Sequence, residues 1–476
     1  MNVRVVNLSN LSHEDASMLH TLLESFESET NKFLKIKLFE PDHCYESDKH
    51  IPFRVTETMV RRTKIKNDLK IFVYTVYSNA KLMGQGGFGT VYSVSGILKH
   101  ADGKMIYKSK QEKPQVIKKY IERHDSAKLE NSLAQKLPDT KMKKITFIYR
   151  EGEKCLSFNV MAEIKGEDFS DTILRHPYTI LQKIVLSISA WNDLKRIDTA
   201  GIIQRDIKPD NMRVNHANMS LRILDFGIGR EKDTVDEKSV GSYPWKSPDM
   251  IANRKTAGAG CDVYSMGLVL GMLFGDKQVR LDKRTLIKDV REKRRKQYAS
   301  NNKYPLWFDD KNIKQWKQEY PWAEMKKLEE ILLSVTTARP ENRSTIDSAL
   351  SGFIELLRQV PMQYAFTQQD APAIAMLLKV GVKPDYAAFT KAVDDSLWEC
   401  VLSFVKANPE NIASSIDCEK AYTYALSASN RTNTYDDAKT IDPIREVNKL
   451  ISSLLITERN EVENECETNR HFKAFG

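Results

Sequence analysis

The sequence predicts an α+β protein made of a small sheet-rich lobe, a larger helical lobe and an all-α C-terminal region of helical hairpins. Three observations predict this organisation. Between about residues 53 and 164, β-branched and aromatic residues form short runs broken by glycine, a pattern typical of strands and turns. After Asp168, apolar residues recur mostly at helical spacing. Beyond about Val360, helical segments alternate with short Pro/Asp/Asn turns.

The composition is that of a globular chain with more than one domain. Its 476 residues exceed the size, about 250–300 residues, at which a single hydrophobic core usually stops growing. Hydrophobic residues make up 41% and charged residues 29% of the chain, which excludes a largely disordered protein. The net charge of +9 includes short basic runs such as residues 293–296, and such runs are most often solvated faces. We therefore predict no nucleic-acid partner.

The cysteines and the apolar segments indicate where the protein acts. Six cysteines are scattered without a Cys-x-x-Cys pair or histidines at ligand spacing, which indicates a reducing compartment and no structural zinc. Neither the first residues nor the longest apolar segments are long enough for a signal-peptide core or a membrane helix. We predict a cytoplasmic protein that does not span a membrane.

Residues 1–74 are predicted to form an extension that packs on, or caps, the next domain. The acidic stretch from Ala16 to Phe39 has leucine and phenylalanine residues near the helical period, which predicts a helix. From about Phe53 to Val91 the pattern changes to alternating β-branched and aromatic residues around a glycine cluster. This pattern predicts strand, turn and strand.

The second predicted domain spans residues 75–358, and its elements can be placed in order along the chain. The apolar patterns predict strands at Gln115–Ile121, Ile145–Arg150 and Cys155–Ile164, and helices at Ser126–Leu137, Tyr178–Lys195 and Asp262–Phe274.

Residues 359–476 are predicted to be a third, all-helical region. The segments 378–380 and 405–407 occupy similar places about 27 residues apart, which indicates ankyrin-like helical hairpins with a shorter period than a standard ankyrin unit. Stacked hairpins commonly present a surface to other proteins. The region is therefore predicted to bind a partner or the substrate.

A glycine-rich turn joins two strand-like runs at residues 84–91. The turn reads Gly-Gln-Gly-Gly-Phe-Gly-Thr-Val, which fits the pattern G-x-G-x-x-G-x-V. Glycine has no Cβ atom, so backbone N–H groups there can approach a polyphosphate closely. An ordinary glycine-rich hairpin would have the same pattern. The candidate nucleotide-binding residues of this turn are Gly84, Gly86, Gly87, Phe88, Gly89 and Val91.

About thirty residues later, a strand-like run carries a candidate phosphate-binding lysine, Lys118. An inward-facing cation there would offset the negative charge of the α and β phosphates. Lys119 is the alternative, although a shift of one residue turns a strand side chain to the opposite face. In the helix that follows, Glu130 lies on the inward stripe and could fix Lys118, whereas the competing Glu122 lies at the end of the strand itself.

The most specific segment is residues 204–211, Gln-Arg-Asp-Ile-Lys-Pro-Asp-Asn, followed by Leu-Asp-Phe-Gly at residues 224–227. With these motifs in order, the sequence resembles the eukaryotic-type protein kinase family from the glycine-rich turn to about Ile354. The resemblance implies a bilobal protein-kinase fold and a transferase that uses ATP and Mg²⁺, with Mn²⁺ as an alternative ion. Lys208, together with Gly241 and Ser242, resembles serine/threonine rather than tyrosine kinases.

The resemblance also implies a role for each motif residue. Asp206 would orient the attacking hydroxyl and accept its proton, while Lys208 would neutralise charge on the moving phosphoryl group. Asn211 and Asp225 would supply the oxygen ligands that Mg²⁺ prefers. The remaining implied positions belong to the adenine pocket: Met161 or Val160 at its back, Ala162, Glu163 and Ile164 in the hinge, and Glu167 or Asp168 near the ribose.

Several positions relate to the stability and switching of the implied fold. Asp249 stands where the family usually has glutamate, and it would pair with Arg343. Gln204 replaces the usual histidine and could still hydrogen-bond to the backbone near residues 225–227. Arg205 commonly receives a phosphate from the activation segment, in which the candidate acceptors are Thr234, Ser239 and Ser242.

The sequence as a whole predicts a protein serine/threonine kinase with a partner-binding region. The alternative is a pseudokinase scaffold, but such proteins usually lose the strand lysine, the loop aspartate or the metal aspartate, and this chain keeps all three. Small-molecule kinases lack Lys208 and the ending Ser-Pro-Asp at residues 247–249. Flanking extensions with ankyrin-like hairpins also resemble effector kinases that intracellular bacteria deliver into host cells, which would place the protein in the host cytosol.

Overall fold

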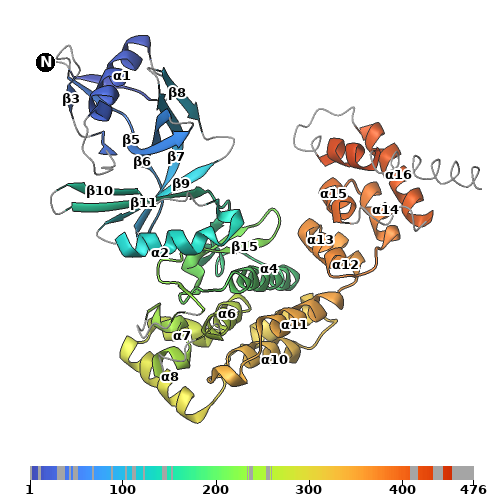
Figure 1. Ribbon diagram of the computed structural model, residues 1–476. Helices are drawn as coiled ribbons and strands as arrows, with labels where there is room; N and C mark the ends of the chain where they lie inside the picture. The colour runs from blue at the N-terminus through green and yellow to red at the C-terminus, as the bar shows by residue number, and fades with distance from the viewer. Residues whose placement is uncertain are drawn as a thin grey trace, which may run out of the picture. The chain divides into compact units, whose positions relative to one another are not determined.

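The computed structural model divides the chain into two compact units (Figure 1). Unit 1 comprises residues 1–165, 196–206 and 224–236, and unit 2 comprises residues 166–195, 207–223 and 237–476. The division falls within residues 204–211, so Asp206 is described with unit 1, and Lys208 and Asn211 with unit 2. The structure describes residues 3–8, 12–28, 38–41, 44–46, 52–66, 69–86, 89–101, 104–109, 114–121, 124–141, 147–151, 154–232, 234, 240–252, 258, 260–407, 416–432 and 443–452.

Unit 1 is built mainly of strands. Its elements are β1 (Arg4–Val6), α1 (His13–Ser28), β2 (Leu38–Phe39), β3 (Tyr45–Glu46), β4 (Pro52–Val55), β5 (Thr58–Lys66), β6 (Leu69–Gly86), β7 (Gly89–Ala101), β8 (Lys104–Ser109), β9 (Gln115–Ile121), α2 (His124–Gln135), the 3₁₀ turn η1 (Pro138–Thr140), β10 (Phe147–Glu151), β11 (Lys154–Ala162), β13 (Ile202–Ile203) and β16 (Arg230–Glu231).

Unit 2 is built mainly of helices. Its elements are β12 (Glu167–Asp168), α3 (Phe169–Thr172), α4 (Ile180–Thr199, whose end belongs to unit 1), η2 (Pro209–Asn211), β14 (Met212–Asn215), β15 (Ser220–Ile223), η3 (Tyr243–Trp245), α5 (Pro248–Ala252), α6 (Gly260–Leu273), α7 (Lys277–Arg284), α8 (Ile287–Ser300), α9 (Asp310–Glu319), α10 (Met325–Val335), η5 (Pro340–Asn342), α11 (Ile346–Arg358), α12 (Met362–Thr367), α13 (Ala371–Lys379), α14 (Tyr386–Asp394), α15 (Trp398–Ala407) and α16 (Ile416–Thr432). Residues 443–452 are also helical.

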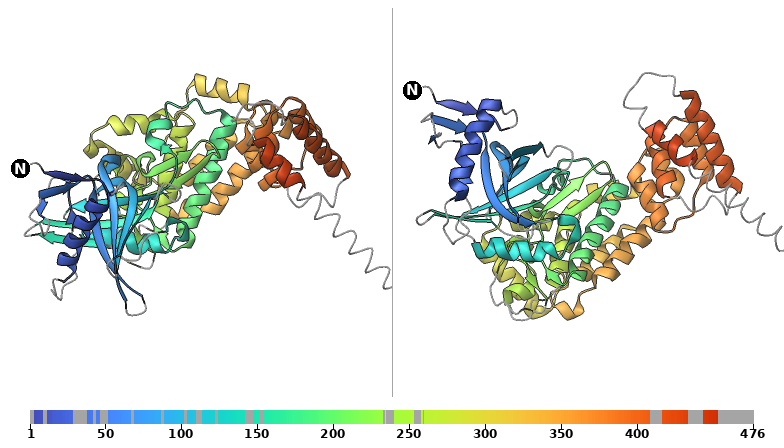
Figure 2. Two further views of the ribbon diagram at one scale, coloured as in Figure 1. Left: turned by 90° about the horizontal axis from the view of Figure 1, so that it is seen from above. Right: turned by 45° about the horizontal axis from the view of Figure 1, so that its top comes forward.

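The main sheet of unit 1 is drawn in blue to teal in Figure 2. Its strand order is β10-β11-β9-β7-β6-β5-β2, with β8 paired to β7. Neighbouring strands run antiparallel, and β7 pairs with β9 through residues 90–93 and with β8 through residues 96–101. Register shifts between β6 and β7 introduce irregularities, which increase the local twist of a sheet. A first hydrophobic core, which includes Leu19 and Leu23 of α1 and Tyr74 and Val76 of β6, holds α1 against this sheet.

The predicted helix from Ala16 to Phe39 is wrong in its last part. Helix α1 ends at Ser28, and Leu38 and Phe39 form β2, which pairs antiparallel with β5. The preceding residues alternate as Lys-Ile-Lys-Leu, which is the period of a strand rather than a helix. Pairing with β5 also provides partners for backbone groups at the edge of the sheet. Strand β6 runs across residue 75, where the second predicted domain begins.

In unit 2, helix α6 packs against α7 and α10, and all its residues from Cys261 to Leu273 are buried. A Cβ atom on Gly267 would lie 2.7 Å from side-chain atoms of Val335 and Thr336, so glycine allows α6 and α10 to approach each other. The basic run at residues 293–296 is only partly a solvated face. Arg294 of α8 is buried and pairs with Asp282 at 3.0 Å, because it shares a helical stripe with other buried residues of α8.

The C-terminal helices α12 to α15 form hairpins, as the sequence pattern predicts. The side chains of Asp370 and Asp385 cap α13 and α14, each accepting a hydrogen bond from the backbone N–H three residues later. The hairpins are joined to the preceding helices by Tyr364 Oη, which donates to the carbonyl of Glu319, and by Arg358 Nε, which donates to that of Val380. Within the described residues, no helix is long and apolar enough to cross a membrane.

Candidate active site

Unit 1 gathers three of the predicted site residues in one cluster, in which two carboxylates surround the buried ammonium group of Lys118. Lys118 Nζ lies 2.8 Å from Glu130 Oε2, 3.1 Å from Glu130 Oε1 and 2.9 Å from Asp225 Oδ1. Strand β9 presents Lys118 to this cluster because its side chains alternate, and Lys119 instead comes within 4.0 Å of Glu40. Glu122 lies outside the described residues. Spacing along the sequence therefore selected the lysine and glutamate that the structure brings together.

The charges of this cluster are strongly coupled. Burial by itself would lower the pKa of Lys118, but the carboxylates of Glu130 and Asp225 outweigh it, so the pKa of Lys118 lies above its ordinary value. Lys118 is consequently an ammonium ion at neutral pH. Its two partners differ in access to solvent, with side-chain exposure of 4% for Glu130 and 24% for Asp225. Asp225 is thus the carboxylate that a ligand could reach.

Gln204 connects the residues around Asp206 to the turn at residues 225–227. Its Nε2 donates to the carbonyl of Asp225 at 2.8 Å and to that of Leu224 at 3.2 Å, while its Oε1 accepts from the backbone N–H of Asp206 at 2.6 Å. The predicted hydrogen bond from glutamine to this turn is confirmed. Arg205 and Asp225 both have positive φ angles, +67° and +59°, which non-glycine residues rarely adopt. The side chain of Gln204 holds the backbone beside both residues.

The first residues after Gly227 are held in place by hydrogen bonds. Arg205 Nε donates to the carbonyl of Ile228 at 2.7 Å, and β16 pairs with β13. Arg230 donates to the carbonyl of Thr234, whose own hydroxyl donates to the carbonyl of Glu231 at 2.8 Å. Ser239 lies outside the described residues. Phosphorylation of this segment stays a prediction.

In unit 2, Lys208 Nζ donates to Ser242 Oγ at 2.8 Å, so the structure brings these two predicted residues together. Asn211 ends η2, where its backbone N–H donates to the carbonyl of Lys208 at 3.0 Å. This hydrogen bond folds residues 208–211 into one tight turn. Lys208 and Asn211 are thereby placed at its two ends.

The glycine-rich turn is the end of the β6–β7 hairpin. Gly84 pairs with Val91, and Gly86 pairs with Gly89. A Cβ atom on Gly89, whose φ is +155°, would lie 2.5 Å from the carbonyl oxygen of Lys119, so only glycine fits there. The predicted residues Gly87 and Phe88 lie outside the described part of the chain.

The hinge residues lie at the end of β11 and directly after it. Met161 pairs with Val116 of β9, and the backbone N–H of Glu163 donates to the carbonyl of Pro114 at 3.1 Å. That N–H group is therefore already bonded within unit 1. A contact of Glu163 with a nucleotide would have to use its carbonyl group or its side chain.

Comparison with known proteins decides the family. A family model described as a protein kinase domain matches residues 77–353, more than half of the chain. The chain belongs to the protein kinase family. The predicted α+β protein-kinase fold, a sheet-rich part followed by a helical part, is thereby confirmed.

Curated kinases match shorter stretches of the chain. A probable serine/threonine-protein kinase of Corynebacterium efficiens is 34% identical over 118 residues, which cover 23% of this chain and 18% of that protein. The mitogen-activated protein kinase mpkC of Neosartorya fischeri is 24% identical over 216 residues, covering 43% and 52%. Mitogen-activated protein kinase 13 of Mus musculus is 30% identical over 117 residues, covering 25% and 29%. The chain thus spans about half or less of the length of these relatives.

Two further features of this kinase were not found from the sequence. Tyr120 and Asn159, both fully buried, complete the hydrogen bonding around Glu130. Tyr120 follows Lys118 by two residues and so faces the same side of β9, which is the one signal that could have indicated it. Asn159 interrupts an apolar strand, and a buried amide in such a place needs hydrogen-bond partners.

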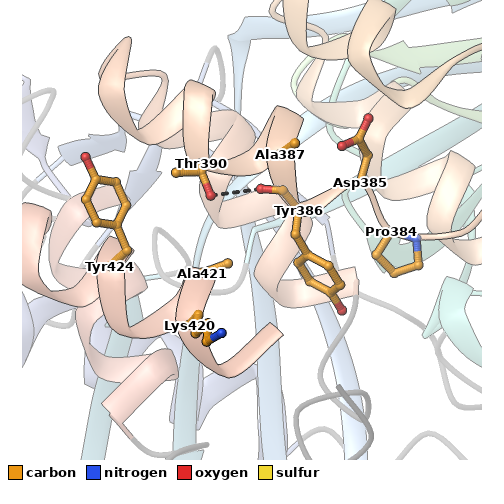
Figure 3. Close-up of a pocket in the computed structure, with 8 residues that line it drawn as sticks. All are labelled: Pro384, Asp385, Tyr386, Ala387, Thr390, Lys420, Ala421 and Tyr424. Carbon is orange, nitrogen blue, oxygen red and sulfur yellow. Dashed lines mark hydrogen bonds between the residues drawn. The ribbon is translucent and has the colours of Figure 1, made fainter. Parts of the chain in front are cut away.

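A groove of about 660 Å³ lies between α14 and α16, well outside the family match (Figure 3). Tyr386 and Thr390 of α14 and Lys420 and Tyr424 of α16 line it. The hydroxyl of Thr390 donates to the carbonyl of Tyr386 at 2.8 Å, which is the bond drawn in Figure 3. The groove combines aromatic rings with an exposed ammonium group.

Proposed function

We propose that this protein is an active serine/threonine kinase that transfers the γ-phosphate of ATP to hydroxyl groups of a protein substrate. The observation that carries the proposal is the cluster of Lys118, Glu130 and Asp225, with every nitrogen–oxygen distance at or below 3.1 Å. An ammonium group held by two carboxylates is fixed in place and fully charged, as a group that orients ATP phosphates must be.

The residue types present in each unit fit ATP and Mg²⁺, and the roles that follow are those that membership of the family implies. Asn211 and the partly exposed Asp225 would hold the metal ion, which supplies positive charge beside the phosphates. Lys118 would orient the α and β phosphates, and the N–H groups of residues 84–91 would contact the phosphate chain. Asp206 would orient the acceptor hydroxyl and take its proton, which makes the oxygen more nucleophilic. Lys208 would balance the negative charge of the transferred group.

Serine/threonine specificity is supported by Lys208 and Ser242. Their hydrogen bond of 2.8 Å supports a role of Ser242 in positioning the acceptor segment rather than as a switch. The bacterial relative is a probable serine/threonine-protein kinase, and the other two relatives are mitogen-activated protein kinases. A pseudokinase remains the second candidate, and the transfer experiment below separates the two.

Transfer of labelled phosphate from ATP tests the proposal, with Lys118→Met compared with Lys119→Met. We expect the first change to lower kcat/KM on the order of 10²-fold, the effect of removing one preorganised charge or donor from an active site. The second change removes the neighbouring lysine on the opposite face of β9 and should leave transfer nearly unchanged. Equal losses in both variants, or none in Lys118→Met, would contradict the assignment.

We further propose the three-part organisation of an extension (1–74), a kinase domain (75–358) and a helical interaction domain (359–476). The groove between α14 and α16 supports a docking role for the third part, because aromatic rings beside Lys420 suit a protein segment that carries a carboxylate next to an apolar side chain. We place this activity in the cytosol, since ATP and protein substrates are both available there. If the protein is an ankyrin-like bacterial effector, that cytosol is the host cell's.

Point variants in the groove test the docking role better than a deletion. Removing α12 to α16 would uncover Trp322, whose ring packs 4.5 Å from that of Tyr364. Lys420→Glu and Tyr424→Ala lie on exposed positions of α16 and should leave the kinase domain intact. We expect both variants to phosphorylate an unstructured test peptide normally but to lose a subset of full-length proteins on a protein array. An unchanged set of array substrates would exclude this groove as a docking site.

A further inference from the structure

We infer that Tyr120 is a positioning residue that, together with Asn159, holds Glu130 where it can fix Lys118. This inference rests on the proposed kinase activity, because Lys118 matters only if it orients a nucleotide. Tyr120 Oη donates to Glu130 Oε2 at 2.6 Å, a shorter contact than either hydrogen bond from Lys118 to Glu130. Glu130 therefore has a second, neutral donor besides the ammonium group.

The direction of the hydroxyl proton is set by Asn159. Asn159 Nδ2 donates to the oxygen of Tyr120 at 3.1 Å, so that oxygen acts as an acceptor toward β11. The single hydroxyl hydrogen is then available for Glu130. Burial, together with the nearby Glu130 carboxylate, raises the pKa of Tyr120 well above its ordinary value, so the hydroxyl keeps its proton at any pH at which a kinase works.

The network is anchored on the helix that carries Glu130. Asn159 Nδ2 also donates to the carbonyl of Ala127 at 2.9 Å, and Asn159 Oδ1 accepts from Asn131 Nδ2 at 3.1 Å. Asn131 in turn accepts a hydrogen bond from Gln135. Two strands of the sheet are thus joined to successive turns of α2 through Tyr120, Asn159 and Asn131, whose side chains are almost wholly buried. A shift or rotation of α2 would break several of these bonds together.

Such a network is costly unless it is complete, because a buried polar group without a partner loses its bonds to water. Apolar residues at positions 120 and 159 would fill the same space and leave α2 free to move between alternative packings. The polar pair instead favours the one position of α2 in which each donor meets an acceptor. The buried hydrogen bonds of unit 1 consequently favour the position of α2 in which Lys118 and Glu130 form their salt bridge.

The test compares the full-length protein with Tyr120→Phe, which keeps the ring and removes only the hydroxyl. We expect kcat to fall about 10-fold or more, the loss that follows when a hydrogen bond to a charged group is removed. The KM for the protein substrate should stay the same. Tyr77→Phe is the matched control, since Tyr77 is also a fully buried tyrosine of the same sheet but lies outside the network.

A double-mutant cycle separates positioning from general packing. Once Glu130→Gln has weakened the interaction with Lys118, adding Tyr120→Phe should lower kcat no further, because the two residues act through one interaction. Hydrogen exchange of the α2 amides should increase in Tyr120→Phe and not in Tyr77→Phe. This exchange is measurable whether or not the protein transfers phosphate.

The outcomes distinguish the inference from the proposed function. If the wild-type protein transfers phosphate and Tyr120→Phe matches it in kcat and in α2 exchange, the positioning role is excluded. Fully additive effects of the two changes would also overturn it, because they would mean that the hydroxyl of Tyr120 acts independently of Glu130. If the wild type transfers nothing, the proposed function fails, and α2 exchange alone decides whether the network holds the helix.

Discussion

Replacing Asp206 by alanine is expected to lower kcat for phosphoryl transfer by about 10²–10⁴-fold, the contribution of a positioned general base. Asp206 is buried, and its backbone N–H is fixed by Gln204 Oε1 at 2.6 Å. The backbone that carries the side chain of Asp206 is therefore held in one orientation. No other residue of the motif at 204–211 has a carboxylate that could take over from this position, because Asp210 projects from the η2 turn and is exposed.

The measurement is transfer of labelled phosphate by the purified full-length protein, with nucleotide affinity measured in parallel. Asp347→Ala is the matched control, because it removes an exposed carboxylate of α11 that forms a surface pair with Lys195. Unchanged nucleotide affinity in Asp206→Ala would show that the loss lies in the chemical step. Equal transfer by the wild type and Asp206→Ala would refute the enzymatic assignment, and binding of ATP without any transfer by the wild type would make the protein a pseudokinase.

The pairing of Lys118 with Glu130 could be predicted from the sequence because each residue lies in a regular strand or helix, where the side of a side chain follows from its position. Lys118 was separated from Lys119 by strand alternation, and Glu130 from Glu122 by its place on a helical stripe with Leu133 and Leu137. The boundaries of β9 agree with the prediction residue for residue. The periodicity of one strand and one helix was therefore sufficient to predict that Lys118 and Glu130 face each other.

Other parts of the molecule depend on contacts between distant segments and could not be predicted in this way. Tyr120 and Asn159 lie 39 positions apart and form a hydrogen bond only because β9 and β11 are neighbours in the sheet. The strand β2 likewise forms because β5 offers it an edge, and the alternation at residues 35–38 was too short a signal to end the predicted helix. Gln204 lies between these two cases. Its side-chain amide allowed a hydrogen bond to the backbone to be predicted from the sequence, but the fold determines that the acceptor is the carbonyl of Asp225.

Replacing Arg343 by methionine should destabilise unit 2 by about 3–5 kcal/mol, the usual effect of removing one partner of a buried ion pair. Arg343 Nη2 lies 2.7 Å from Asp249 Oδ1, and both residues are buried. The predicted pair is thus formed although aspartate is shorter than the usual glutamate. Arg343 Nε and Nη2 also donate to the carbonyls of Thr337 and Ala338, each at 2.8 Å.

The loss should be large because two kinds of group are left without partners. Asp249 would remain as a buried carboxylate with no cation, and the carbonyls of Thr337 and Ala338 would lose a shared donor. Arg343→Lys should recover little of the stability, since an ammonium group cannot reproduce the planar fork of donors that these three acceptors require.

Urea unfolding followed by tryptophan fluorescence measures the effect, because the buried Trp245 and Trp316 belong to unit 2. Lys195→Met serves as the control, since it breaks the exposed pair with Asp347 and should change stability by no more than about 1 kcal/mol. Similar small changes in both variants would mean that Arg343 contributes packing rather than charge compensation. A double variant, Arg343→Met with Asp249→Leu, should then separate the two effects, because removing the uncompensated carboxylate restores stability only if that charge is the cause.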